Sequence, residues 1–357
     1  MALSKIKSSS MADTAIHGRR NLIINGAMTI DQRNSGSSVN LANAKVFVVD
    51  RFYWIENSSE TPTSQQVTDA PNGFTHSVKI TNTSTTTTPS YTQLIHRIEG
   101  NNVSQLYFGN SSAESVTLSF YVKSSLTGQF SASLRNADSD RSNVSTYTIN
   151  SANTWERKII TFVGDTTGTW ATDTSVGLNI IFRLDDTGGT SSLNQWTATG
   201  DAFASGSVRF MGNASATWQI TGVQLEVGEQ ATPFEHRSFG EELALCQRYY
   251  WHTYSYGTPA GTTFNQDYEA PIIIIGTGNH GMGVCNAVYP VEMRALPAVS
   301  FYGSDGTANR IRYWNSGSLS TYGTVNRSTR QILGMSFDAG TNPEDFYSAA
   351  LVCDAEL

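Results

Sequence analysis

The sequence contains few charged residues. Asp, Glu, Lys and Arg make up 15% of its 357 residues, well below the roughly 25% of an average globular protein. Serine, threonine, asparagine and glycine take their place, which is typical of short strands joined by polar turns. Disorder is the competing interpretation of so polar a chain. An aromatic content of 11% and ordered apolar alternation argue against it.

Features that would indicate nucleic acid or membrane partners are also missing. The chain has no run of basic residues and a net charge of −7, which argues against a surface that follows nucleic-acid phosphates. The longest apolar runs, such as 272–275, are too short to cross a bilayer, so we expect no membrane insertion. Residues 1–19 lack the apolar stretch of a secretory signal peptide.

Cysteine is scarce, and its spacing indicates no shared site. Cys246, Cys285 and Cys353 lie far apart in the chain, and none belongs to a CxxC pair. An odd number with this spacing argues against a disulfide scaffold and against a zinc site. We expect three buried free thiols, with a Cys285–Cys353 bridge as the alternative. No metal or other cofactor is expected.

Regular alternation of apolar and polar residues predicts β-strands. In 115–123 (SVTLSFYVK) and 176–184 (VGLNIIFRL), every second residue is apolar, which places one row of side chains on each face of a strand. Turn sequences such as 126–128 (LTG) separate these segments. Together they predict an all-β protein built on an antiparallel sandwich.

One predicted strand changes the side to which its apolar residues point. Trp218 and Ile220 occupy even positions, whereas Val223 and Leu225 occupy odd positions. A strand has a period of two, so this change requires an inserted residue. We therefore predict a β-bulge at Thr221–Gly222, where glycine tolerates the unusual backbone.

A short helix is predicted directly after this strand. Ser238 precedes Glu241 by three residues, which is the spacing of a capping box. Leu243, Cys246 and Tyr250 then fall on one helical face. A helix this short is not stable alone in water, so we expect these three residues to contact both of two β-domains.

The sequence divides into four parts on this basis. The predicted boundaries are an N-terminal attachment arm at 1–19, a β-sandwich at 20–236, a linker helix at 237–250 and a C-terminal β-domain at 251–357.

Seven segments carry a resemblance to a known family. They occur, in order, at 21–33 (NLIINGAMTIDQR), 50–52 (DRF), 94–100 (LIHRIEG), 117–130 (TLSFYVKSSLTGQF), 164–170 (GDTTGTW), 220–250 (ITGVQLEVGEQATPFEHRSFGEELALCQRYY) and 289–297 (YPVEMRALP). This set resembles a module of tail-fibre and other virion structural proteins of tailed bacteriophages. The first part also resembles the jelly-roll carbohydrate-binding modules attached to glycosidases.

The resemblance implies a virion protein with a jelly-roll sandwich as its first domain. It also implies a homo-oligomer, often a trimer, that contacts other virion proteins. The expected role is a tail fibre or related appendage that supports recognition of a host-surface glycan without catalysis. A head fibre or capsid decoration (cement) protein is the first alternative, and a glycan depolymerase is the second.

Calcium is not carried over from the carbohydrate-binding relatives. Those modules often hold a structural calcium with one acidic residue in the first strand and another in the last. The corresponding positions of this chain are Ala27, Met28 and Thr221, none of which is acidic.

We expect no catalytic residues. A glycosidase needs two carboxylates on a rigid cleft, and the visible pairs are Asp138 with Asp140 and Asp185 with Asp186. Both pairs lie in sequences rich in Gly, Ser and Asn, where aspartate stabilises turns through local hydrogen bonds. The six histidines are scattered and form no metal-binding or triad pattern.

Tryptophans in turn-like segments are the candidate glycan contacts. Trp170, Trp196 and Trp314 lie in such segments, and their indole faces could stack on sugar rings. The alternative is that they cap the sandwich core or fill subunit contacts. Trp54, Trp155 and Trp218 lie within strand patterns, so we expect them in the core.

Overall fold

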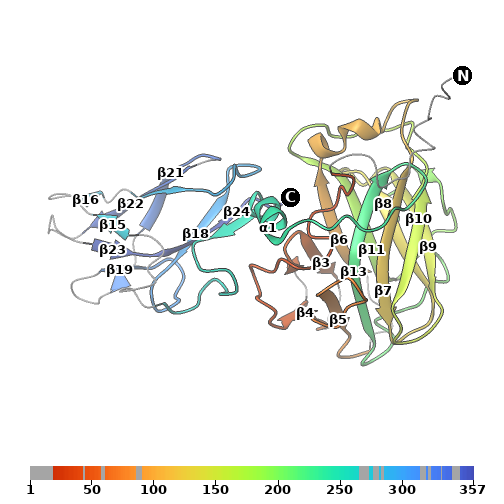
Figure 1. Ribbon diagram of the computed structural model, residues 1–357, viewed down its shortest axis with the longest axis horizontal. Helices are drawn as coiled ribbons and strands as arrows, with labels where there is room; N and C mark the ends of the chain where they lie inside the picture. Colours follow the sequence, from red (N-terminus) through yellow and green to blue (C-terminus); the bar gives the residue numbers. More distant parts are fainter. Residues whose placement is uncertain are drawn as a thin grey trace, which may run out of the picture.

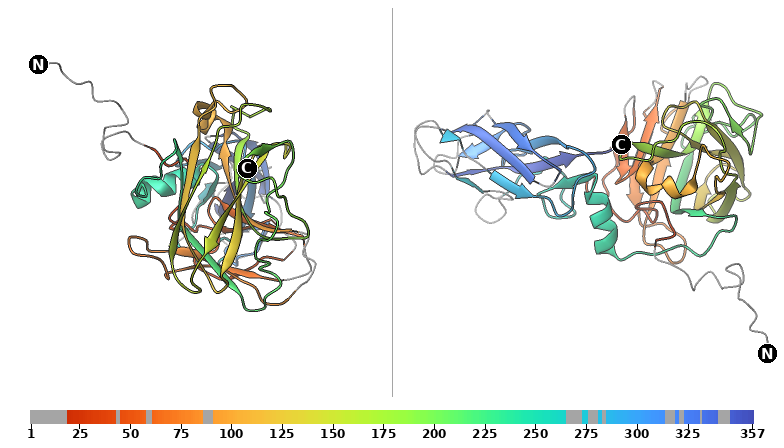
Figure 2. Two further views of the ribbon diagram at one scale, coloured as in Figure 1. Left: turned by 90° about the vertical axis from the view of Figure 1, so that its right-hand side faces the viewer. Right: turned by 90° about the horizontal axis from the view of Figure 1, so that it is seen from above.

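The protein is described here by a computed structural model of the full chain. Two β-rich units lie along the longest axis of the molecule, with helix α1 between them (Figure 1 and the right-hand view of Figure 2). The residues that the structure describes are 19–42, 45–57, 61–85, 91–264, 273–275, 281–282, 285–313, 319–320, 323–330, 332–339 and 346–357.

The first unit consists of antiparallel strands and two short 3-10 helices. The 3-10 helices are η3 (Gly100–Asn102) and η4 (Ser104–Leu106). The strands are β1 (Val39–Asn40), β2 (Val46–Val49), β3 (Phe52–Glu56), β4 (Thr63–Val67), β5 (Ser77–Thr81), β6 (Tyr91–Glu99), β7 (Val116–Ser124), β8 (Gly128–Arg135), β9 (Ser142–Ile149), β10 (Glu156–Phe162), β11 (Val176–Asp186), β12 (Trp196–Thr197) and β13 (Thr217–Val227).

These strands form two sheets, which makes the first unit a jelly-roll sandwich. The six-stranded sheet has the order β1-β4-β5-β13-β7-β10, and the seven-stranded sheet has the order β12-β9-β8-β11-β6-β3-β2. Alternate residues of β7 and β11 are buried in one apolar core between the sheets. Trp54 and Trp218 lie in this core as expected, whereas Trp155 is only half-buried and donates to Asp69. The predicted all-β class is confirmed.

A β-bulge explains why the apolar residues of β13 change from even to odd positions. The register between β13 and β7 shifts between Thr221 and Gln224, and Gly222 has a φ of +62°. Ile220 and Val223 are consequently both fully buried, one on each side of the shift. Glycine is required because a Cβ at this position would lie 2.7 Å from the Phe74 ring and because φ is positive.

Residues 21–26 (NLIING) contain an apolar run closed by an Asn-Gly pair, a pattern that predicts a strand ending in a turn. The structure shows no strand there. Asparagine side chains hold this segment instead. Asn21 Oδ1 accepts from Leu225 N at 3.1 Å, and the Asn25 side chain bonds to the backbone of Ile30 in both directions, at 2.8 and 2.9 Å. Asn25 has a φ of +61°, which interrupts any regular strand.

The second unit contains shorter strands in smaller sheets. The sheets have the orders β14-β24-β18, β15-β23-β19-β20 and β16-β22-β17, with β21 paired to β22. The strands are β14 (Tyr250–His252), β15 (Ile273–Ile275), β16 (Gly281–Met282), β17 (Cys285–Val288), β18 (Ala298–Tyr302), β19 (Ile311–Tyr313), β20 (Leu319–Ser320), β21 (Gly323–Ser328), β22 (Ile332–Ala339), β23 (Phe346–Ser348) and β24 (Ala350–Asp354).

Helix α1 (Phe239–Gln247) separates the two sets of strands and is shorter than predicted. Its cap is the predicted one, because the Ser238 side chain accepts from Glu241 N. The helix ends before Tyr250, whose backbone pairs with Asp354 in β14. Among the helices in the described part of the chain, none has the length and apolar character needed to cross a membrane.

We predict that Gly222→Val will lower the free energy of unfolding by about 1–3 kcal/mol, because it combines backbone strain with a steric clash. Gly228→Val is the matched control: Gly228 also has a positive φ, but a Cβ added there would have no atom within 4 Å, so it should cost less. Chemical denaturation of both variants measures the difference. An equal loss would show that the contact with Phe74 contributes nothing.

Candidate functional site

An apolar cluster attaches α1 to the first unit. Cys246 and Tyr249 are buried against Ile24 and Ile30, and Leu243 packs on the same cluster from a half-buried position. Tyr249, which follows the helix, therefore packs in this cluster, where the sequence pattern predicted Tyr250. Cys246 and Cys353 are buried free thiols, so a disulfide at Cys353 is not formed.

A buried carboxylate fixes the start of the helix to the asparagine-held segment. Glu242 Oε1 accepts from Asn25 N at 2.5 Å and from Arg237 Nη1 at 3.3 Å. Arg237 also donates to Ile23 O at 3.0 Å. The Glu242 carboxylate thus joins the helix, the segment before it and residues 23–25 in one hydrogen-bonded group.

Asp50 forms a second buried group at the same junction. The amide group of Gln32 donates to Asp50 Oδ2 and, at 2.9 Å, to Tyr250 O. His252 Nε2 lies 3.1 Å from Gln32 O. Complete burial raises the pKa of Asp50 to about 7, although the nearby Arg33 acts in the opposite direction.

Two arginines of the first unit meet the last residues of the chain. Arg33 Nη1 lies 2.9 Å from Asp354 Oδ2, and its guanidinium lies 3.6 Å from the centre of the Tyr250 ring. Arg51 pairs with Glu356, and both side chains are almost completely buried. Tyr250, assigned to the helix by its sequence pattern, therefore contacts the first unit from β14.

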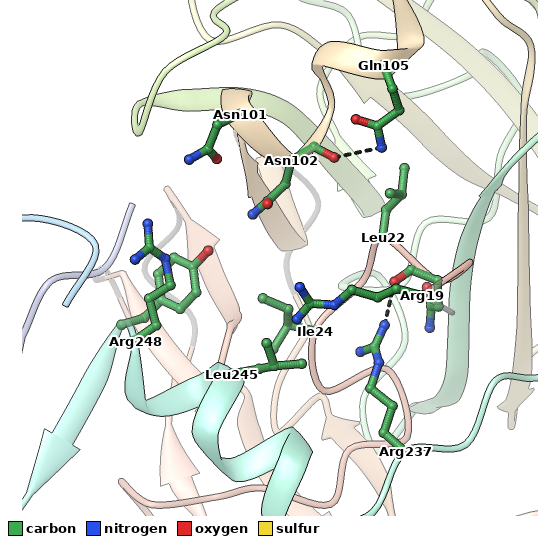
Figure 3. A pocket seen from close by; sticks show the side chains of 11 residues that line it. Arg19, Leu22, Ile24, Asn101, Asn102, Gln105, Arg237, Leu245 and Arg248 are labelled. Atoms are coloured by element: carbon green, nitrogen blue, oxygen red, sulfur yellow. Dashed lines mark hydrogen bonds between the residues drawn. The ribbon is translucent and has the colours of Figure 1, made fainter. Parts of the chain in front are cut away.

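A pocket lies beside this network. It has a volume of about 400 Å³, and Figure 3 shows its lining side chains coming from α1, from residues 22–24 and from the 101–105 segment. Two lining arginines already have carboxylate partners: Arg248 binds Glu99 through two bonds of 2.8 Å, and Arg237 binds Glu242. These two arginines therefore contribute little unpaired positive charge to the pocket.

A second, smaller pocket lies at the loop that carries Trp170. Asp165 organises this loop, because its carboxylate accepts from Arg141 at 2.6 and 2.8 Å and from Thr167 N at 3.2 Å. The Asp165 carbonyl accepts from Gly109 N at 2.7 Å. This bond joins the loop to the segment that follows η4.

Aromatic rings form the wall of this second pocket. Trp170 and Phe108 meet edge to face at 4.9 Å between ring centres, and Tyr107, 56% exposed, lies at the rim. Trp196 packs behind them, 5.3 Å from Trp170. We call this the aromatic pocket; its lining residues are Val103, Ser104, Tyr107, Phe108, Asn110, Trp170, Ala171 and Thr172.

The indole groups of the aromatic pocket are fixed by local hydrogen bonds. Trp170 Nε1 donates to Thr167 O at 3.2 Å, and Trp196 Nε1 donates to Val163 O at 2.7 Å. Their rings are thereby held in place before any ligand arrives. The pocket has a volume of about 210 Å³, below the roughly 300–1,000 Å³ of drug-sized sites, which suits one sugar ring.

The structure thus brings together two of the three tryptophans predicted as glycan contacts. Trp170 lines the aromatic pocket, and Trp196 supports it from behind. Trp314 lies outside the described residues. The sequence analysis missed the exposed Tyr107 and the half-buried Phe108, because no local pattern distinguishes aromatic residues at a pocket from those of the core.

Three of the four aspartates noted in the sequence, Asp140, Asp185 and Asp186, have partners within the protein. Asp185 is buried in β11, not in a turn as expected, and it pairs with Arg209 and accepts from Met211 N at 2.9 Å. Asp140 accepts from Asn136 Nδ2 at 2.6 Å. Within the described residues, no cluster of three or more His, Cys, Asp or Glu side chains could hold a metal ion.

No family model and no curated protein sequence matches the chain. Among solved structures, it is similar to the enzymatically active domain of tailspike protein 4 of bacteriophage CBA120, with 13% identity and a TM-score of 0.32 over 58% of this chain and 21% of that one. It is also similar to the family 11 carbohydrate-binding module of Clostridium thermocellum bound to a mixed-linked tetrasaccharide, with 12% identity and a TM-score of 0.29 over 55% of this chain and 98% of that one.

Similarity at this level carries no argument about function. The fold class rests on the strands and sheets of the chain itself, and the candidate site rests on its own geometry. The chain spans about a fifth (21%) of the tailspike domain.

We predict that Asp50 makes stability decrease as pH rises from about 4, near the ordinary pKa of aspartate, to about 7, its raised value in the folded protein. The folded state holds a proton there that the unfolded state releases, so folding is favoured at the lower pH. Asp50→Asn should remove this contribution.

The measurement is the difference in denaturation midpoint between wild type and Asp50→Asn at pH 5 and pH 8. A difference is needed because burial also lowers the pKa of His96 and His252, which titrate in the same range with the opposite effect. Asp138→Asn, in an exposed turn, is the control. A pH-independent difference would contradict the prediction.

We predict that Glu242→Gln will destabilise the protein by about 1–3 kcal/mol, because it weakens charged hydrogen bonds to Asn25 N and Arg237. The adjacent, exposed Glu241 lies in the same first turn, so Glu241→Gln should change stability by no more than about 0.5 kcal/mol. Thermal unfolding of the two variants tests this. Equal effects would mean that only the helix dipole matters at these positions.

Proposed function

We propose that the protein is a non-catalytic saccharide-binding component of a bacteriophage virion. The aromatic pocket carries this proposal: an exposed tyrosine and a fixed tryptophan face a small cavity, with the polar side chains of Ser104, Asn110 and Thr172 around it. Apolar ring faces with a few placed polar groups are the usual composition of a small-molecule site. Such a site suits the C–H faces and hydroxyl groups of one sugar ring.

The place of the protein in a virion is supported by its sequence. The segments at 21–33 and 220–250, which resemble phage tail-fibre modules, are the ones that build the junction through Asn25, Gln32, Glu242 and Tyr249. We propose a tail fibre or related appendage, assembled as a homo-oligomer such as a trimer, in which the first unit presents the aromatic pocket to a host-surface glycan.

We also propose that the protein does not cleave the glycan that it binds. The described lining of the aromatic pocket contains no carboxylate, whereas glycoside hydrolysis uses a pair of them across the sugar bond. Asp185 is buried against Arg209, so it is not available as a general acid. A depolymerase is therefore the least supported of the three candidate functions.

A structural role as a head fibre or capsid decoration protein is the second candidate. Strand β10 lies at the edge of the six-stranded sheet. Ile159 of this strand is 53% exposed, and Val163, which directly follows it, is 54% exposed. Apolar side chains beside an open sheet edge favour contact with another chain. In that function, the aromatic pocket would be covered by a neighbouring subunit.

We predict that Trp170→Ala will weaken saccharide binding at least tenfold, about 1.4 kcal/mol, because the ring supplies the stacking face. The ligand would first be found on an array of bacterial surface glycans, and its affinity measured by calorimetry. Trp155→Ala is the matched control, since the half-buried Trp155 bonds to Asp69 and does not line the pocket.

Two results would count against the saccharide-binding role. One is equal affinity of wild type and Trp170→Ala for the array ligand. The other is the absence of any ligand on the array, which would favour the structural role.

A further inference from the structure

Three arginines share the outer face of the seven-stranded sheet. Arg97 of β6 and Arg135 of β8 both lie opposite Asn179 of β11, which places them in one row across three adjacent strands. Arg183 lies further along β11 on the same face. Side chains alternate along a strand, and the neighbouring Ile180 and Phe182 point into the core, so the arginines point outward.

Arg97 and Arg183 have partners that account for their positions. Arg97 donates to Asn179 Oδ1 at 3.1 Å and to Leu357 O at 2.8 Å. Arg183 pairs with the Asp186 carboxylate and donates to Gln93 Oε1 at 2.7 Å. These two side chains are held in place, and Arg183 has a carboxylate partner of its own.

Arg135 is different, because the described residues give it no carboxylate partner. Its Nη1 donates to Gly200 O at 3.2 Å, and its Nε is buried without a hydrogen-bond partner. Burial and the positive charges of Arg183 and Arg97 lower the pKa of Arg135 to about 10. The guanidinium is still charged at neutral pH, at an energetic cost that an anion would relieve.

Tyr53 supplies a second, independent indication at the same place. Its hydroxyl group is buried without a hydrogen-bond partner, although Lys45 Nζ and Arg97 Cζ lie 4.6 and 5.1 Å from its ring centre. Arg135 Nε and the Tyr53 hydroxyl are thus two buried donors on this face that have no acceptor. Buried donors are rarely left without an acceptor, so these groups indicate a missing one.

We propose that this corner of the sheet, formed by Tyr53, Arg97 and Arg135, binds an oxyanion. A carboxylate or phosphate oxygen there would accept from Arg135 and from the Tyr53 hydroxyl, and arginine binds both groups strongly. The ion could be free or could belong to an acidic saccharide. The site is separate from the aromatic pocket, since none of its residues lines that pocket.

The test is calorimetry on the full chain with two anionic probes. These are inorganic phosphate and an oligogalacturonate, with the methyl-esterified oligomer as the uncharged counterpart. We expect wild type to bind at least one anionic probe and not the ester, and Arg135→Gln to bind it at least tenfold more weakly. Arg310→Gln, in the second unit, should bind as wild type does.

The two probes separate the possible sources of the anion. Binding of phosphate supports a site for the free ion, and binding of oligogalacturonate alone supports an acidic saccharide. Binding of neither probe, or equal binding by wild type and Arg135→Gln, overturns the proposal. Because the aromatic pocket is tested by Trp170→Ala, failure here leaves the proposed saccharide-binding function standing.

Tyr53→Phe tests the site without removing a charge, and it decides the matter if Arg135→Gln does not fold. Loss of an unpartnered buried hydroxyl should raise the melting temperature of the free protein. Loss of a donor should weaken probe binding several-fold. A purely structural tyrosine would not show these opposite effects, so unchanged probe binding contradicts the proposal.

Discussion

The buried ion pair between Arg51 and Glu356 is the interaction on which the arrangement of the two units depends. Arg51 lies in the turn between β2 and β3 with a φ of +70°, a conformation that costs free energy for a residue with a Cβ. Its guanidinium also donates to Arg97 O at 2.6 Å and lies 3.4 Å from the centre of the Tyr249 ring. One side chain thus contacts the end of the chain, the first sandwich and the residue after α1. Separating these parts would leave two buried charges without partners, which is far more costly than losing an exposed pair.

The topology of the second unit brings Glu356 to this position. Strand β24 lies between β14 and β18, and β14 begins three residues after α1 ends. The last strand therefore returns to the helix, and residues 354–356 reach Arg33 and Arg51. A helix of nine residues is too short to be stable alone. It is stabilised because both its apolar side, at Cys246, and its acidic first turn, at Glu242, are buried against the first unit.

Local sequence patterns predicted those features that depend on neighbouring residues. Alternation located β7 and β11, the change of side located the bulge at Gly222, and the capping spacing located Ser238 at the start of α1. Residues 21–26 were misread as a strand, because the side-chain bonds of Asn21 and Asn25 to distant backbone are not visible in a local pattern. The same limit applies to Arg51 and Glu356, which lie 305 positions apart. It also applies to Trp155, which directly precedes β10 and is half-buried because β10 lies at the edge of its sheet.

One segment connects the junction to the aromatic pocket. Glu99, at the end of β6, binds Arg248 through two hydrogen bonds. The 3-10 helices η3 and η4 follow directly, and then Tyr107 and Phe108 form part of the pocket wall. The backbone of this segment is anchored on the way, by Gly100 N to Ser175 O at 2.9 Å and by Gly109 N to Asp165 O at 2.7 Å. A wall fixed at both ends gives a ligand a prepared surface, which reduces the entropy lost on binding. It also means that the contacts that hold the second unit in place hold one side of the proposed saccharide site as well.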